Sequence, residues 1–232
     1  QIVRYFRSAS MRGEESRQVL YLMGPVGSGK SSLVEKLKYA LEVNKFYAIE
    51  GCPMHEEPLH LLPQHMRAKF SDLLNVQIEG DLCPVCRWRL KNEYNNNYEN
   101  FKVVTREFSR RARVGIGMVP PVDPNNQDTS VLIGGEDISK LDLHSEGDPR
   151  VLDLSGAMNV GNRGMVEFIE VFKNEVEYLH VMITATQEKV IPAPGRHGMI
   201  YLDSAIIAHS NEAEWRKFRA DHTNEAILDR IV

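Results

Sequence analysis

An eight-residue segment near the start of the chain has the residue types and spacing of a phosphate-binding loop. It runs from Gly24 to Ser31 and satisfies the pattern G-x-x-x-x-G-K-[ST]. The glycines let the backbone wrap around phosphate oxygens, so that amide N–H groups point at them, and a following helix adds the partial positive charge of its N-terminus. Lys30 is then expected to reach the β- and γ-phosphates, and the Ser31 hydroxyl to ligate Mg²⁺.

The sequence on either side of this loop supports the interpretation. The apolar run Val19–Met23 precedes the loop and predicts a buried strand, while the apolar positions from Leu33 to Leu41 have helical spacing. A strand that enters the loop and a helix that leaves it are what the chemistry requires, so we expect a nucleoside triphosphate and Mg²⁺ as cofactors. The expected nucleotide contacts are Gly24, Pro25, Val26, Gly27, Ser28, Gly29, Lys30, Ser31 and Ser32.

A second apolar segment, residues 164–172, carries two carboxylates that could act on the bound nucleotide. Hydrolysis needs a carboxylate at the end of a neighbouring strand to orient water and help hold the metal. Such a strand usually ends in Asp-Glu, and here Ile169 takes the Asp position and Glu170 the Glu position. We therefore expect Glu170 to polarise water and to serve the Mg²⁺ side, with Glu167 as a second metal-side candidate. The alternative for both acids is an exposed strand face.

Two further polar residues have positions that fit roles in catalysis. Asn211 closes the apolar run Ala205–Ser210, where it would touch the γ-phosphate or the attacking water. Its alternative role is to cap the helix that follows, and both roles can hold at once. Arg230 follows about twenty residues later, where it would act as an arginine finger on a neighbouring subunit's γ-phosphate. The alternative is a surface ion pair with Asp229.

The elements that must position these residues form an α/β pattern. Residues 1–18 predict a short amphipathic helix and a polar connector, and residues 19–232 the core domain. After the strand and loop, we expect a helix from Lys30 to Val43 and a second strand over Phe46–Ile49. This β-loop-α-β order predicts the opening of an α/β sheet.

The middle of the chain is less regular than its two ends. Residues 51–153 predict an insertion, which is either a solvated surface region or a partner-binding one. In the last third, Val190–Leu202 predicts a hairpin with Pro and Gly at its turn. A buried strand over Ala205–Ser210 and a helix over Ala213–Arg219 follow it.

Composition narrows the class of protein. Of the 232 residues, 42% are hydrophobic and 26% charged, which argues against wholesale disorder, and the formal net charge of -4 argues against a globally basic nucleic-acid binder. No apolar run reaches the ~20 residues that span a bilayer. Three cysteines indicate a reducing compartment rather than a disulfide scaffold. The missing initiator Met and signal peptide suggest a trimmed or excised fragment.

Cys83 and Cys86 form a C-x-x-C pair that could ligate zinc. A tetrahedral Zn²⁺ site needs four ligands, and Cys52, His55 and His60 could complete one. The alternative is two partly buried thiols at the junction between a turn and a helix. A redox pair is disfavoured, because the pattern around the pair is not the βαβ of a thioredoxin-like fold.

The chain as a whole resembles the PrkA-type serine protein kinases of bacteria. The resemblance extends over essentially the whole sequence and rests on the segments GPVGSGKSSLVEKLK, FYAIEGCPMHEEPLHLLP, NNQDTSVLIGGEDISKL, GNRGMVEFIEVFK, ITATQEKV, IIAHSNEAEWRKFR and NEAILDRI. It implies a cytoplasmic AAA+ ATPase module with a central parallel sheet flanked by helices, an arginine finger and ring-like self-association. The hairpin at 190–202 resembles the extra hairpin of the magnesium-chelatase and replicative-helicase branch.

The resemblance also implies an activity. Proteins of this family are described as serine protein kinases, so we expect an ATP-hydrolysing module that serves phosphorylation of protein substrates on Ser or Thr. The lid of AAA+ modules and the family's C-terminal domain lie beyond this sequence, and the motifs of eukaryotic protein kinases are not found in it. Two alternatives stay open: an AAA+ ATPase that remodels proteins, and a nucleotide-binding switch with little hydrolysis, suggested by Ile169.

Overall fold

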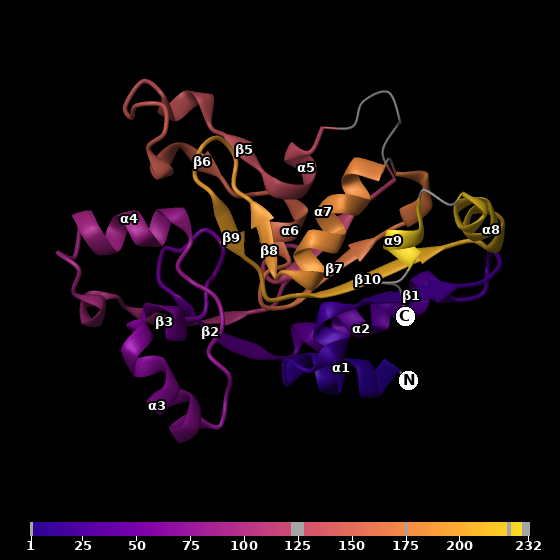
Figure 1. The fold of residues 1–232 in the computed structure, drawn as a ribbon, viewed down its shortest axis with the longest axis horizontal. Coiled ribbons are helices and arrows are strands. Elements are labelled where there is room, and N and C mark those ends of the chain that lie inside the picture. The colour runs from indigo at the N-terminus through magenta and orange to yellow at the C-terminus, as the bar shows by residue number, and fades with distance from the viewer. Residues whose placement is uncertain (1, 122–127, 175, 222–223, 229–232) are drawn as a thin grey trace.

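The centre of the molecule is a parallel sheet. The computed structural model describes residues 2–121, 128–174, 176–221 and 224–228. Within these ranges the central sheet has four strands in the order β1-β10-β7-β4 (Figure 1). Their bounds are Val19–Met23 for β1, Ala205–Ser210 for β10, Met165–Phe168 for β7 and Ile116–Val119 for β4. The expected α/β architecture with a parallel sheet is therefore confirmed.

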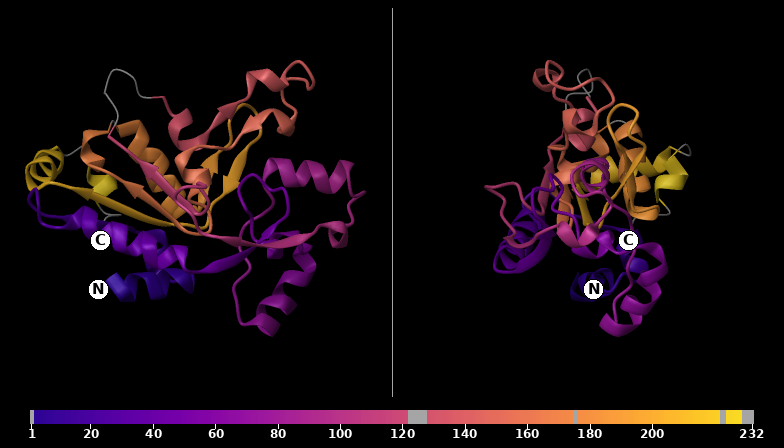
Figure 2. Two further views of the ribbon diagram at one scale, coloured as in Figure 1. Left: turned by 180° about the vertical axis from the view of Figure 1, so that it is seen from behind. Right: turned by 90° about the vertical axis from the view of Figure 1, so that its left-hand side faces the viewer.

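Helices cover both faces of this sheet. Helices α1 (Ile2–Ser10) and α2 (Lys30–Glu42) lie against one face, and α7 (Val176–Gln187) lies against the other (Figures 1 and 2). On the first face Tyr5 and Val34 pack against buried side chains of the strands. On the second face α7 contributes to the larger of two buried apolar clusters. Strands covered on both sides have the near-continuous apolar sequences seen here.

The first strand and helix form as the sequence predicts. Strand β1 has the predicted bounds, and α2 ends at Glu42, one residue before the predicted end. The side-chain amide of Asn44 donates a hydrogen bond to the carbonyl of Ala40, at 2.8 Å, and so satisfies one carbonyl that the end of the helix leaves free. The order of strand, loop and helix around the glycine-rich segment is thereby confirmed.

The predicted second strand forms, but in a different sheet from the one expected. Strand β2 (Lys45–Ile49) pairs antiparallel with β3 (Val103–Glu107) in a separate two-stranded sheet. Phe46 packs on Phe108 with ring centroids 4.5 Å apart, and Lys45 forms an ion pair with Glu107. The expectation that it continues the central sheet was wrong, because long-range side-chain pairs, rather than local pattern, choose a strand's partner.

The predicted insertion over residues 51–153 is interrupted by a core strand. Strand β4 lies inside this range and pairs with β7 along the whole length of both strands. Helix α3 (Gln64–Leu74) and helix α4 (Pro84–Asn92) precede β4 in the sequence. The short elements that follow it are α5 (Ser130–Ile133), β5 (Gly135–Glu136) and β6 (Leu152–Asp153). Residues 51–153 therefore contain two additions to the core, one on each side of β4.

The predicted hairpin before the last core strand is present. Strands β8 (Val190–Pro192) and β9 (Met199–Tyr201) pair antiparallel, and β10 follows directly. The remaining α-helices in the described residues are α6 (Ala157–Val160), α8 (Glu212–Ala220) and α9 (Glu225–Leu228). Among the described helices we find none with the length and apolar character that a membrane crossing requires.

Two ends of the molecule carry different structures. The glycine-rich loop and α8 lie at one end of the long axis, because β1 and β10 run parallel and both finish there. Helices α3 and α4 lie at the opposite end, as the views from the front and from behind both show (Figures 1 and 2). Each end therefore carries its own group of candidate functional residues.

Candidate functional site

The glycine-rich loop is an open turn between β1 and α2. Residues 25–29 are all exposed, and Gly24 is buried at the exit of the strand. Gly27 and Gly29 have φ values of 81° and 85°, which is the left-handed region that side chains with a Cβ rarely adopt. A Cβ on Gly24 would lie 2.9 Å from Oγ of Ser28. The backbone conformation thus favours glycine at positions 27 and 29, and the Ser28 side chain packs closely over Gly24.

Lys30 folds its side chain back across the loop. Its ammonium donates hydrogen bonds to the carbonyls of Gly24 and Pro25, at 2.6 and 2.9 Å. Helix α2 begins at this residue, so the amides of its first turn have no carbonyl within the helix to bond. Ser31 and Ser32 are exposed in that same turn. The loop therefore gathers a cation, helix-end amides and two hydroxyls on one exposed surface.

The register of the sheet brings the other candidate residues to the same edge. Met23 pairs with Ser210, so Gly24 and Asn211 leave β1 and β10 side by side. Phe168 pairs with Ala208, which puts Glu170 at about the level of the last β10 residue. Because parallel strands end at one edge of a sheet, the three segments predicted to act on the nucleotide converge there.

Asn211 caps helix α8, as the alternative interpretation predicted. Its Oδ1 accepts a hydrogen bond from the backbone N–H of Glu214 at 2.9 Å. The residue before it, Ser210, lies 2.5 Å from the hydroxyl of Tyr21 on β1. These contacts fix where the chain leaves the sheet beside the loop. The capping role is confirmed, and the role toward a γ-phosphate stays a prediction.

Glu170 lies just beyond the end of β7, in an unusual backbone conformation. Its φ and ψ are 47° and 53°, the left-handed region, which is uncommon for a residue other than glycine and gathers at functional sites. The carboxylate forms an ion pair with Lys173, whose ammonium also lies 3.5 Å from Glu214 of α8. The side chain is 37% exposed, so its carboxylate is open to solvent at the edge of the sheet.

Glu167 lies in a different environment, buried on the α2 side of the sheet. One carboxylate oxygen is 2.5 Å from the ammonium of Lys38 on α2, and the other is 3.1 Å from Nε2 of His209 on β10. Burial alone would raise the pKa of Glu167, but the hydrogen bonds from His209 and Lys38 outweigh it and leave this pKa below its usual value. The alternative of an exposed strand face is thus wrong for Glu167.

Sequence reasoning missed Lys38 and His209, the partners of Glu167. Lys38 also contacts Glu35, whose carboxylate pairs with Arg110 at 2.5 Å, so charged groups run from the sheet to the surface. A signal for this contact was present in the sequence. Lys38 interrupts the apolar face of the predicted helix, and Glu167 interrupts the apolar run of the predicted strand. Opposite charges on two facing apolar surfaces indicate a buried ion pair. Arg230 and Asp229, by contrast, lie outside the described residues.

Comparisons with known proteins agree with this arrangement. Among protein families, the PrkA AAA domain matches the chain over residues 1–232. The chain belongs to this family. The ATP-dependent protease PrkA of Bacillus subtilis is 43% identical over 98% of the chain. The serine/threonine kinase YeaG of Escherichia coli K12 is 36% identical over 100% of it. The chain spans 37% of the length of each of these relatives.

The fold of this PrkA AAA domain is also that of a solved AAA+ protein. The complex between subunits BchI and BchD of magnesium chelatase contains a chain that matches 99% of this one with a TM-score of 0.58. The identity is 15% and 55% of that chain is covered, so the match shows the fold alone. Family and fold together establish an ATPase-type AAA+ module with a nucleotide-binding P-loop fold.

Proposed function

We propose that this PrkA AAA domain binds ATP with Mg²⁺ at the loop 24–32 and hydrolyses it. One observation carries the proposal: the register of three parallel strands brings the loop, Glu170 and Asn211 to a single edge of the sheet. Nucleotides bind at this carboxyl edge in open α/β sheets, and amides at the start of a helix suit phosphate groups.

The exposed groups around the loop fit a nucleotide with its metal ion. The amides after Gly29 and the ammonium of Lys30 offer positive charge to the phosphates, and Lys30 exchanges its two carbonyl partners for phosphate oxygens. The exposed hydroxyl of Ser31 and the carboxylate of Glu170 are oxygen ligands of the kind that Mg²⁺ prefers. When bound, Mg²⁺ neutralises charge on the β- and γ-oxygens.

Glu170 and Glu167 take different roles in this proposal. Glu170 is exposed at the edge and holds the proton of the attacking water, with Lys173 as its resting partner. Glu167 has both oxygens against Lys38 and His209, so it acts as a positioning residue that ties β7 to α2. Asn211 orients the γ-phosphate or the water from the next strand while its Oδ1 caps α8.

The loop residues at the edge are open to solvent, which suits completion by a second subunit. Residues 25–29 are all exposed, so a neighbouring copy can approach the phosphates. Arg230 of that copy supplies a positive charge, which stabilises the negative charge that develops during phosphoryl transfer. A ring of copies follows if each subunit gives its finger to the next. Hydrolysis then powers work on protein substrates by the larger protein.

Serine/threonine phosphorylation is the second part of the proposal. It rests on the name of the Escherichia coli relative, whereas the Bacillus subtilis relative is named a protease. The two activities differ in the group that accepts the γ-phosphoryl: a protein hydroxyl in a kinase, and water in an ATPase that drives protein processing. Replacement of the usual Asp by Ile169 also suits a switch that turns ATP over slowly.

Incubation of the full-length protein with γ-labelled ATP separates these possibilities. Label on Ser or Thr of an added protein supports the kinase, and free phosphate whose release rises with an unfolded protein supports the remodelling ATPase. Tight binding with little turnover supports the switch. A full-length protein that binds no nucleotide at all in the presence of Mg²⁺ contradicts the whole proposal.

A further inference from the structure

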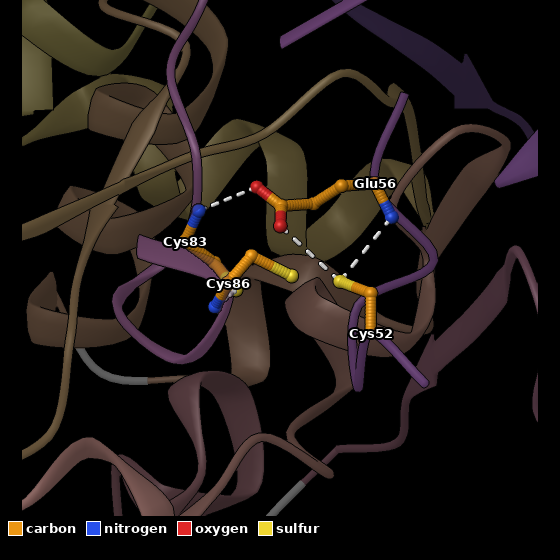
Figure 3. Close-up of side chains that lie close together, drawn as sticks. All are labelled: Cys52, Glu56, Cys83 and Cys86. Atoms are coloured by element: carbon orange, nitrogen blue, oxygen red, sulfur yellow. Dashed lines mark hydrogen bonds between the residues drawn. The ribbon is translucent and has the colours of Figure 1, made fainter. Parts of the chain in front are cut away.

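Three cysteines and a glutamate come together at the end of the molecule opposite the P-loop. The Sγ atoms of Cys52, Cys83 and Cys86 and a carboxylate oxygen of Glu56 all lie within 4.8 Å of one another (Figure 3). The three cysteines are 3%, 1% and 0% exposed, and Glu56 is 2% exposed. All the cysteines of the sequence thus meet in one place, around the acidic side chain of Glu56.

Two separate parts of the chain deliver these four side chains. Cys52 and Glu56 belong to the loop after β2, which turns sharply at Gly51 with a φ of 70°. Cys83 is the N-cap of α4, and Cys86 lies in the first turn of that helix. The C-x-x-C pair therefore has the expected position at a junction between a turn and a helix.

Backbone hydrogen bonds in the cluster favour negative charge on the sulfur and carboxylate oxygen atoms that accept them. The amide of Cys86 donates to Sγ of Cys83 at 3.4 Å, and the amide of Glu56 donates to Sγ of Cys52 at 3.5 Å. The amide of Cys83 donates to one oxygen of Glu56 at 2.5 Å, and the thiol of Cys52 donates to the other at 3.2 Å. Amides directed at sulfur and carboxylate oxygen are the surroundings that metal-ligating groups receive in proteins.

We propose that Cys52, Glu56, Cys83 and Cys86 bind one Zn²⁺ ion that fastens the loop after β2 to helix α4. Three thiolates and a carboxylate are a complete tetrahedral set for zinc. Zn–S bonds of about 2.3 Å and Zn–O bonds of about 2.1 Å put the donor atoms roughly 3.5–3.8 Å apart in a tetrahedron. The observed separations, within 4.8 Å, therefore need only a small contraction.

Burial of these four groups without a cation is costly. The Glu56 side chain is only 2% exposed, and burial disfavours a carboxylate that no cation compensates. His60 lies beside it, with Nδ1 at 3.8 Å from Oε1 of Glu56, and within the described part of the chain both of its buried ring nitrogens are without a hydrogen-bond partner. A dication at the centre offsets the acidic charge. The thiol protons then pass to solvent, and no electron is transferred.

The donor set differs from the one that the sequence suggested. Cys52 joins the C-x-x-C pair as proposed, but the fourth donor is Glu56, and neither His55 nor His60 belongs to the set. His60 lies beside the carboxylate of Glu56 but outside the set of donors. A reactive redox pair would need an accessible sulfur, whereas Cys83 and Cys86 are almost completely buried.

Elemental analysis of the purified full-length protein tests the proposal. We expect one zinc per chain after dialysis against metal-free buffer, and loss of zinc in the double variant Cys83→Ser/Cys86→Ser. The matched control is Phe101→Ala, which removes a buried side chain from the same apolar cluster but no ligand. This control should lower stability and retain zinc. Iron in place of zinc, or zinc that persists in the double variant, overturns the proposal.

Cobalt substitution keeps the test decisive if the double variant fails to fold. The wild-type protein, stripped of metal under reducing conditions and titrated with Co²⁺, should show thiolate-to-cobalt charge transfer and the visible bands of a tetrahedral ion. Glu56→Gln should weaken zinc affinity while the charge-transfer absorption remains, because the thiolates are intact. A wild-type protein that takes up neither Zn²⁺ nor Co²⁺ overturns the site. These readouts are independent of ATP, so their outcome leaves the proposed ATPase unaffected.

Discussion

The two ends of the molecule present their candidate binding groups in opposite ways. At one end the P-loop is exposed; glycines with positive φ shape it, and free amides at the start of α2 face its ligand site. At the other end the cysteine cluster is buried, and its donors are side chains from two segments far apart in sequence. A nucleotide must enter and leave, whereas a structural metal ion stays for the life of the fold. The exposed P-loop is thus suited to a ligand that exchanges, and the buried cysteine cluster to one that stays bound.

Removal of the P-loop lysine is the most severe test of this comparison. We expect Lys30→Ala to abolish ATP binding or turnover without unfolding the domain, because the partners of the ammonium among the described residues are two loop carbonyls and the Ser28 hydroxyl. Isothermal titration with ATP and thermal unfolding measure the two properties. Lys36→Ala, an exposed lysine of the same helix, is the control and should bind normally. Normal affinity in a folded Lys30→Ala variant contradicts the P-loop assignment.

Loss of the proposed finger tests whether the open edge is completed by a second subunit. We expect Arg230→Ala to lower kcat by ~10³ while ATP still binds, because a finger stabilises charge that appears only during phosphoryl transfer. Specific activity of the wild type should also rise with protein concentration.

Mixing variants decides whether Arg230 acts between subunits. Full-length Lys30→Ala mixed with full-length Arg230→Ala creates interfaces that join an intact P-loop to an intact finger, so partial activity should return. Full activity of Arg230→Ala alone excludes the role. An inactive mixture in which hetero-oligomers demonstrably form excludes it too, and the ion pair with Asp229 then becomes the better interpretation.

Neutralising the edge carboxylate should have the next largest effect. We expect Glu170→Gln to keep ATP binding but to slow hydrolysis by about two orders of magnitude, the scale of a lost general base. Single-turnover rates measure the step, and Glu212→Gln, an exposed acid on the neighbouring helix α8, is the control. A larger loss from Glu167→Gln would show that the catalytic carboxylate is the buried one.

Breaking the buried ion pair between Lys38 of α2 and Glu167 of β7 should lower the stability of the domain. Lys38→Met leaves the carboxylate of Glu167 buried without its cation, which we expect to cost about 3–5 kcal/mol of unfolding free energy. The pair Lys38→Met/Glu167→Leu should cost less, since no charge is stranded. Lys45→Met removes one partner of the exposed pair with Glu107 and should cost less than about 1 kcal/mol. Denaturant titration compares all three, and equal losses from Lys38→Met and Lys45→Met contradict the argument.

Local patterns predicted the P-loop edge well and the opposite end poorly. The loop at Gly24–Ser31, the helix after it and the hairpin at 190–202 depend on neighbouring residues, so spacing alone located them. The partner of β2 and the membership of β4 in the central sheet depend on contacts between distant segments. A short apolar run does not by itself specify the strand with which it pairs.

The candidate sites divide in the same way. Gly24 and Asn211 lie at one edge because parallel strands share an edge, which the order of elements already indicates. Glu56 could not be chosen over His55 or His60, because Pro53 and Pro58 interrupt the segment that carries them and no helical spacing fixes which side chain turns inward. The fourth metal ligand is therefore chosen by the path of the loop in the folded protein. The ion pair between Lys38 and Glu167 likewise depends on how α2 packs against the sheet.

Zinc removal should have the smallest effect of these changes on ATP binding at the P-loop. A chelator is expected to lower the melting temperature, because the metal links the loop after β2 to α4 and both pack in the main apolar cluster. Binding to the folded state raises stability by an amount set by ligand concentration and Kd alone. If the two ends are independent, saturating ATP with Mg²⁺ in excess of the chelator stabilises zinc-loaded and zinc-free protein equally. Differential scanning calorimetry of both forms, with and without nucleotide, measures this. A stabilisation by ATP that disappears in the zinc-free form would show that the buried cluster controls the open site across the length of the molecule.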